Sequence, residues 1–118
     1  MKVIIAGGRD YKPTIEDYAR IRTLLTNSLC TEIVSGGCSG ADAFGEEMAK
    51  ILQIPCKRFE AKWDEHGRAA GPIRNRAMAQ YADAVILFSG GAGTASMEKE
   101  ALKAGIWIHK VTHETEGI

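Results

Sequence analysis

The stretch ADAVILFSGGAGT, residues 82–94, runs from apolar residues into a loop with three glycines in four positions. Its apolar part is continuous, which is typical of a strand buried on both faces of a parallel sheet. The residues that follow suit a helix over 94–104, closed by Gly105. The stretch therefore predicts a strand at 83–88, a glycine loop at its carboxyl end and then a helix.

Strand and helix patterns alternate in the same way along the rest of the chain. Parallel strands need crossover connections, and right-handed helical crossovers dominate. We therefore predict one Rossmann-like α/β domain over residues 1–118, a three-layer sandwich whose parallel sheet has about five strands. Further strands are expected at 3–6, 32–35, 55–60 and 106–111, and further helices from a capping box at Thr14, from 39–42 and from Pro72 to about Ala82.

Three details of this pattern can be compared with a structure. Residues 61–71 carry no clear periodicity and are expected to form a long loop. The helix after Pro72 has Ile73, Ala77 and Tyr81 on one stripe. The tail from Thr112 is polar and is not expected to join the sheet.

Composition limits the classes of partner. Fifteen basic residues balance fifteen acidic ones, whereas nucleic-acid binders usually carry a basic excess, so nucleic acid is not expected as a partner. No apolar run approaches the ~20 residues of a membrane span, and no segment resembles a signal peptide, so we expect a cytoplasmic protein without membrane contact. The three cysteines, and His66, His109 and His113, show no metal-ligand spacing. No metal and no cofactor are expected.

A glycine pair follows three of the expected strands, at 7–8, 36–37 and 90–91. Ligands of parallel sheets bind beyond the carboxyl ends of the strands, so the three loops are expected to line one crevice. Glycine lets backbone N–H groups approach a phosphate, and a helix N-terminus adds partial positive charge. A tight turn would also explain any single pair. Neither GxGxxG nor GxxxxGK[ST] occurs, which argues against dinucleotide-dependent hydride transfer and ordinary nucleotide triphosphate hydrolysis.

Charged and aromatic residues near these loops have two interpretations each. Arg74 is expected in the first turn of its helix, where the macrodipole disfavours a cation, so an anion is its expected partner. Asp42 either caps its helix or presents a carboxylate to the crevice, and Trp63 either stacks on a base or packs against the protein. The expected ligand-binding residues are Gly7, Gly8, Arg9, Asp10, Gly36, Gly37, Gly90, Gly91, Gly93 and Thr94.

Four motifs in order along the chain resemble the SLOG superfamily, especially its small YspA-type members found in bacteria and phages. They are GGRD, SGGCSGAD, AGPIRNRAM and ADAVILFSGGAGT. The superfamily also includes the "lonely guy" phosphoribohydrolases and the DNA-processing protein A family. The resemblance implies a Rossmann-like domain that binds a nucleotide or a nucleotide-derived molecule. It also implies a homo-oligomer, because the phosphoribohydrolases are dimers.

In some branches of the superfamily the crevice cleaves the N-glycosidic bond of a nucleoside 5′-monophosphate. Those phosphoribohydrolases have an arginine nine residues before the aspartate that opens the strand, followed by PGGxGTxxE. Arg74 and Asp83 reproduce the spacing, and the glycines and Thr94 of residues 90–94 match the loop.

Two positions depart from the phosphoribohydrolase pattern. Ser89 replaces the proline, and Met97 stands where those enzymes have glutamate. Glu98 follows one position later, which is about 100° further around a helix. Because ribosyl cleavage normally needs a carboxylate, we predict a ligand-binding or sensor protein. The alternative is a phosphoribohydrolase-like enzyme with Arg74 and either Asp42 or Glu98 as catalytic residues.

Overall fold

The computed structural model describes residues 1–111; the predicted polar tail from Thr112, with His113, lies outside the described residues. Strands and helices alternate along the described part, as the sequence predicts. In chain order they are β1 (Lys2–Ala6), α1 (Ile15–Asn27), β2 (Glu32–Ser35), α2 (Ala41–Leu52), β3 (Cys56–Arg58), α3 (Trp63–His66), a 3₁₀ turn (Gly67–Ala69), α4 (Ala70–Tyr81), β4 (Ala84–Leu87), α5 (Ala92–Ala104) and β5 (Trp107–Lys110).

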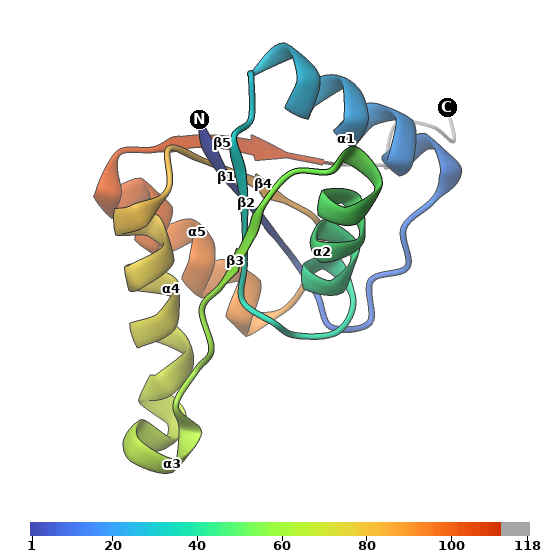
Figure 1. Cartoon of the computed structure of the whole chain (residues 1–118). Helices are drawn as coiled ribbons and strands as arrows, with labels where there is room; N and C mark the ends of the chain where they lie inside the picture. The colour runs from blue at the N-terminus through green and yellow to red at the C-terminus, as the bar shows by residue number, and fades with distance from the viewer. Residues whose placement is uncertain (112–118) are drawn as a thin grey trace.

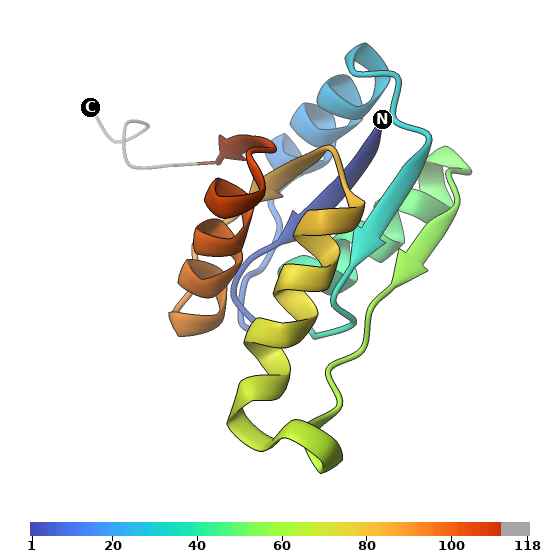
Figure 2. The same ribbon diagram turned by 90° about the vertical axis from the view of Figure 1, so that its left-hand side faces the viewer.

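The five strands form one parallel sheet in the order β3-β2-β1-β4-β5. Helices α1 and α2 cover one face, and α4 and α5 cover the other (Figures 1 and 2). The predicted Rossmann-like three-layer sandwich is therefore confirmed. The chain first adds strands on one side of β1 and then returns to add β4 and β5 on the other side. The strand order thus reverses between β1 and β4, where sheets of this type bind ligands.

The two helical layers produce two hydrophobic cores, one on each face of the sheet. Neighbouring residues of β1 point in opposite directions, so that Ile5 joins the core beneath α1 and α2 and Ile4 joins the core beneath α4 and α5. Both side chains are fully buried. Burial on both faces explains why β1 and β4 have continuous apolar runs in the sequence rather than alternating ones.

Local signals in the sequence place several element ends correctly. Thr14 caps α1 and forms a capping box with Asp17. Gly105 ends α5 in the left-handed conformation, with φ of 72°. Strand β2 covers Glu32–Ser35, as predicted.

The prediction of a loop over residues 61–71 is wrong. This segment contains α3, the 3₁₀ turn and the first two residues of α4. Pro72 is the third residue of α4 rather than its first. A proline is tolerated there because the N–H groups of a first helical turn have no acceptor within the helix. Of the stripe predicted on this helix, Ile73 is 43% exposed, whereas Tyr81 is partly buried against the core beneath α4 and α5.

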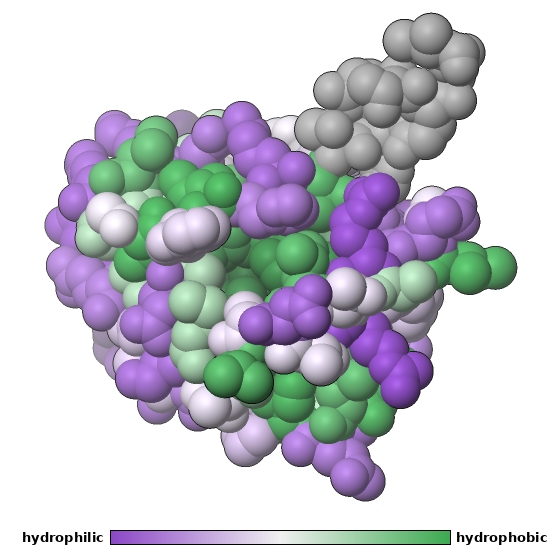
Figure 3. Space-filling model, turned by 90° about the horizontal axis from the view of Figure 1, so that it is seen from above, coloured by the Kyte–Doolittle hydropathy of each residue, from purple (hydrophilic) through white to green (hydrophobic). Residues whose placement is uncertain are grey.

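An apolar hollow of about 280 Å³ opens at the amino-terminal ends of the strands, between α1 and β5. Figure 3 views this end of the molecule and shows apolar side chains gathered near its middle. The residues that line the hollow include Met1, Val3, Ala84 and Trp107, of which Trp107 is 77% exposed. Within residues 1–111, no helix is long and apolar enough to cross a membrane.

Candidate functional site

A cavity of about 550 Å³, called the crevice below, lies at the opposite end of the sheet, beside the carboxyl ends of β1 and β4. Its walls come from the loop after β1, the start of α2, the α3 segment, and the first turns of α4 and α5. The buried residues Ala6, Met78 and Met97 contribute an apolar inner surface. The crevice therefore occupies the position that the reversal of strand order predicts.

Backbone hydrogen bonds connect the loop after β1 to the loop after β4 and to the start of α2. The Gly8 N–H donates to the Ser89 carbonyl at 2.9 Å, and the Gly8 carbonyl accepts from the Ala41 N–H at 3.1 Å. A Cβ on Gly40 would lie 2.2 Å from the Gly8 carbonyl oxygen, and one on Gly90 would lie 2.6 Å from the Gly8 nitrogen. Glycine is needed at these positions because backbone meets backbone, and not only because a ligand needs access.

The third glycine loop also contains positions of a different kind. A Cβ on Gly91 or on Gly93 would meet no atom within 4 Å, and both residues line the crevice. Gly90 is different, since its Cβ would lie 2.1 Å from Oγ1 of Thr94. Gly90 is needed for close packing against Gly8 and Thr94, whereas Gly91 and Gly93 border open space. The sequence alone does not distinguish these two roles.

Helix α5 points its N-terminus into this open space. Its first backbone hydrogen bond is made by the Ala95 N–H to the Gly91 carbonyl, at 3.1 Å. Within residues 1–111, the N–H groups of Ala92, Gly93 and Thr94 have no hydrogen-bond acceptor. These donors and the Thr94 side chain lie at the positive end of the helix dipole. This arrangement is suited to an anion.

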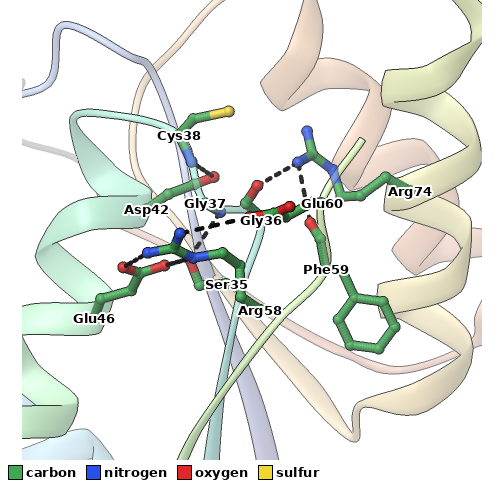
Figure 4. Close-up of polar contacts among 10 residues, drawn as sticks. All are labelled: Ser35, Gly36, Gly37, Cys38, Asp42, Glu46, Arg58, Phe59, Glu60 and Arg74. Carbon is green, nitrogen blue, oxygen red and sulfur yellow. Dashed lines mark hydrogen bonds and ion pairs between the residues drawn. The ribbon is translucent and has the colours of Figure 1, made fainter. Parts of the chain in front are cut away.

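Arg74 lies on the crevice wall and joins three elements (Figure 4). Its Nη1 donates to the Gly36 carbonyl at 2.6 Å, after β2, and to the Phe59 carbonyl at 3.5 Å, after β3. Its Nε donates to Oδ1 of Asn75 at 2.9 Å. Because α4 begins at Ala70, Arg74 lies in the second turn and not in the first as predicted. Backbone carbonyls therefore hold the guanidinium in place, in addition to any anion.

The side chains of Asp42 and Arg74 both lie close to Gly36. A Cβ on Gly36 would lie 2.7 Å both from Asp42 Oδ2 and from Arg74 Nη1. The Asp42 carboxylate is only 7% exposed, lines the crevice and accepts the Cys38 N–H at 3.2 Å. Burial raises the pKa of Asp42, against the opposing effects of the Cys38 N–H and Arg74. Asp42 thus both fixes the local backbone and presents a buried carboxyl group to the crevice.

The second glycine pair is held by side chains that the sequence did not single out. The Arg58 side chain lies against Gly37, whose φ is 78° and whose Cβ would be 2.8 Å from Arg58 Cδ. Arg58 forms a 2.6 Å ion pair with Glu46, and the Glu46 carboxylate accepts the Ser35 hydroxyl at 2.8 Å. Ser35 Oγ in turn accepts the Gly37 N–H at 3.0 Å (Figure 4). Hydrogen bonding to Arg58 lowers the pKa of Glu46.

Several predicted site residues lie elsewhere. Met97 is 1% exposed and lines the crevice, whereas Glu98 forms a 3.0 Å ion pair with Lys110 of β5 and does not line it. One helical position thus turns the Glu98 carboxylate away from the crevice and toward β5, and a catalytic role for Glu98 stays a prediction. Of the remaining predicted residues, Gly7, Gly8, Arg9, Gly91, Gly93 and Thr94 line the crevice, and Asp10, Gly36, Gly37 and Gly90 do not.

Asn75 has a larger part in the site than its sequence context suggested. It is 4% exposed and accepts from Arg74 while its Nδ2 donates to Ser96 Oγ at 3.1 Å and to the Gly93 carbonyl at 3.4 Å. It therefore fixes the first turns of α5 relative to α4. The only signal was its place beside Arg74, since Ser96 is 21 residues away in the chain.

Comparison with known proteins gives two matches. A model of the family described as "YspA, cpYpsA-related SLOG family" matches residues 1–66. The chain is also 30% identical over 122 residues to the Gene 61 protein of Mycobacterium phage D29, with 89% of this chain and 91% of that protein covered. No solved structure matches significantly.

Proposed function

The chain is a member of the YspA, cpYpsA-related SLOG family, and on this premise we propose that its crevice binds a nucleotide or nucleotide-derived phosphorylated ligand. Membership associates the chain with nucleotide-related ligand binding or processing. The observation that carries the proposal is the N-terminus of α5, whose N–H groups at 92–94 lack acceptors within residues 1–111 and face the crevice. Their role is to hold the phosphate, and the role of the protein is that of a sensor or ligand-binding protein.

The charge of the crevice supports an anionic ligand. Arg9, Arg68 and Arg74 line it, against the single carboxylate of Asp42. The chain as a whole has no net charge, so this local excess of arginine is not a general property of its surface. Positive charge concentrated in a cleft attracts anions and strengthens their binding.

The size of the crevice supports a ligand larger than phosphate. Its volume of about 550 Å³ lies within the roughly 300–1,000 Å³ typical of small-molecule sites. The apolar surface of Ala6, Met78 and Met97 suits the less polar part of such a ligand. A nucleoside monophosphate combines an anionic group with a largely uncharged body.

We expect the phosphate to supply most of the affinity. Calorimetry with AMP, GMP, CMP and UMP should show that at least one of these nucleotides binds. The corresponding nucleoside, which lacks the phosphate, should bind about 10- to 150-fold more weakly. That ratio corresponds to the roughly 1.5–3 kcal/mol of charge-assisted hydrogen bonds. The four nucleosides are the matched controls. Absence of binding by all four nucleotides at about millimolar concentration would contradict the proposal.

A phosphoribohydrolase-like reaction is the second candidate function. The observation in its favour is Asp42, a buried carboxyl group on the crevice wall with a raised pKa, as general acids and bases often have. Against it, Met97 occupies the position of the enzymes' glutamate, and Glu98 is paired with Lys110. A methionine can neither transfer a proton nor stabilise an oxocarbenium ion.

We therefore expect release of free base from nucleoside monophosphates to be slow or absent in a chromatographic assay. Rapid release that Asp42→Asn abolishes would instead establish the hydrolase, with Asp42 as its carboxylate. The asparagine keeps an acceptor for the Cys38 N–H. Because the folded pKa of Asp42 is raised, its charge lowers stability above that pKa, so Asp42→Asn should be no less stable than the parent at pH 7. Loss of activity would then not reflect unfolding.

Homo-oligomerisation stays a prediction from the family resemblance. The absence of a nucleic-acid partner stays a prediction from the neutral charge of the chain.

A further inference from the structure

Resting on the proposed nucleotide site, we infer that Trp63 is the stacking surface for the base of the ligand. The recognised ligand is then a nucleotide with its base attached, and a sugar phosphate alone is a much weaker ligand. Trp63 acts as a specificity-determining residue, whereas the α5 N-terminus acts on the phosphate.

The position of Trp63 follows from the α3 segment. This segment extends beyond the carboxyl ends of the strands before the chain turns back into α4 (Figures 1 and 2). Trp63 is its first residue and lines the crevice. A Cβ on Gly71, in the first turn of α4, would lie 3.4 Å from Trp63 Cη2. The edge of the indole therefore lies close to the first turn of α4, and Gly71 lines the crevice beside it.

The indole retains free surface at this position. Trp63 is 49% exposed. Tyr11, Tyr18, Phe44, Phe59, Tyr81 and Phe88 each have another aromatic ring nearby. No such ring contact and no cation–π contact involves Trp63 within residues 1–111. A half-exposed indole on a cavity wall is a surface on which a planar base can stack, and such stacking tolerates any base.

The two kinds of contact suit the two ends of a nucleotide. The unbonded N–H groups of α5 are donors for an anion, whereas Trp63 offers an apolar aromatic surface on another wall of the same crevice. A free phosphate or a sugar phosphate would use only the N–H groups of α5. The second tryptophan, Trp107, lies in the apolar hollow at the opposite end of the sheet and has no part in the crevice.

This placement allows a direct optical test. The chain has two tryptophans, so in Trp107→Phe all indole fluorescence comes from Trp63. In this background, the tightest-binding nucleotide among AMP, GMP, CMP and UMP should change the Trp63 emission on titration, and ribose 5-phosphate should leave it nearly unchanged. Calorimetry on the same samples gives both affinities.

Substitution of Trp63 separates base recognition from phosphate binding. We expect Trp63→Ala to weaken the nucleotide by about 5- to 150-fold, the range for loss of one base–aromatic stack, and to leave ribose 5-phosphate within about twofold. Trp63→Phe keeps a smaller ring and should recover much of the nucleotide affinity. Thermal unfolding of each variant verifies that the domain is folded. If Trp63→Ala is not folded, Trp63→Phe is used for the binding measurements instead.

Three outcomes would overturn the inference. Equal affinity of the parent for nucleotide and ribose 5-phosphate would show that the base is not recognised. An equal loss of both ligands in Trp63→Ala, or no loss of either, would show that Trp63 is structural or irrelevant. If neither ligand binds the parent, the proposed function fails together with the inference, and that result is distinct from the other two.

Discussion

Replacing Gly40 with alanine is expected to lower the free energy of unfolding by about 2–5 kcal/mol. Gly40 has a φ of 74° and a ψ of −124°, backbone angles that strain a residue with a Cβ by about 1–3 kcal/mol. The new Cβ would also lie 2.2 Å from the Gly8 carbonyl oxygen and 2.5 Å from that of Arg9. Both are backbone atoms of the loop after β1, so relief requires the crevice wall to move. Urea unfolding at pH 7 measures the loss.

Gly105→Ala is the comparison for Gly40→Ala. Gly105 has nearly the same φ, 72°, but a ψ of 24°, in the left-handed region, and its Cβ would meet no atom within 4 Å. It should therefore lose only the left-handed conformational cost of about 1–2 kcal/mol. The larger loss expected for Gly40→Ala combines the collision between the loops with the less favourable ψ of Gly40. Equal losses would mean that the loop after β1 yields freely and that the contact at Gly8 does not hold the crevice together.

Replacing Arg74 with alanine is expected to weaken nucleotide binding by about 10- to 150-fold, the value of a charge-assisted hydrogen bond of roughly 1.5–3 kcal/mol. Arg74 lies on the crevice wall with its guanidinium fixed by the carbonyls of Gly36 and Phe59. A ligand does not have to order this side chain on binding, so its charge is available at little entropic cost. Calorimetry with the tightest-binding nucleotide tests the prediction.

Arg76→Ala is the control for Arg74→Ala. Arg76 lies on the same helix, but it is paired with Glu100 at 3.4 Å and does not line the crevice. Its removal should change the affinity by less than about twofold, because Arg76 lies outside the crevice and its side chain is 59% exposed. Glu100 is only 7% exposed and loses its partner in this variant, so the stability of Arg76→Ala must be measured too. Arg74→Ala also leaves the Gly36 carbonyl without its donor, so thermal unfolding must accompany the titration. Equal effects of the two substitutions would argue against a specific role for Arg74.

The sheet could be predicted because its signals are local. The run Ala84–Leu87 is a continuous apolar segment, and Ile33 and Val34 form the apolar centre of Glu32–Ser35, so each strand can be identified without knowledge of its neighbours. The cap at Thr14 and the terminator Gly105 depend only on residues within one helical turn. From these elements the place of the crevice followed, because parallel sheets bind ligands where the strand order reverses.

The failures concern contacts between distant residues or surfaces with little burial. The α3 segment is exposed, so it has no apolar periodicity to reveal its helix. Glycines with different structural roles look alike in the sequence. Gly90 has no room for a Cβ because the backbone of Gly8, 82 residues earlier, lies against it, whereas Gly93 borders open space. The ion pair between Glu98 and Lys110 of β5 also joins two different elements, so helical spacing alone does not reveal it.

The central position of β1 has a consequence for how the domain is made. Among the five strands of the sheet, β1 is synthesised first, yet one of its two neighbours is β4, with Val3 paired to Ala84. Until that later segment is synthesised, β1 has one unpaired edge in the middle of an incomplete sheet, and such edges favour association between nascent chains. Pairing between strands so far apart in the chain is also slow. Completion of the domain therefore waits for β4, and the crevice between the two loops is among the last features to form.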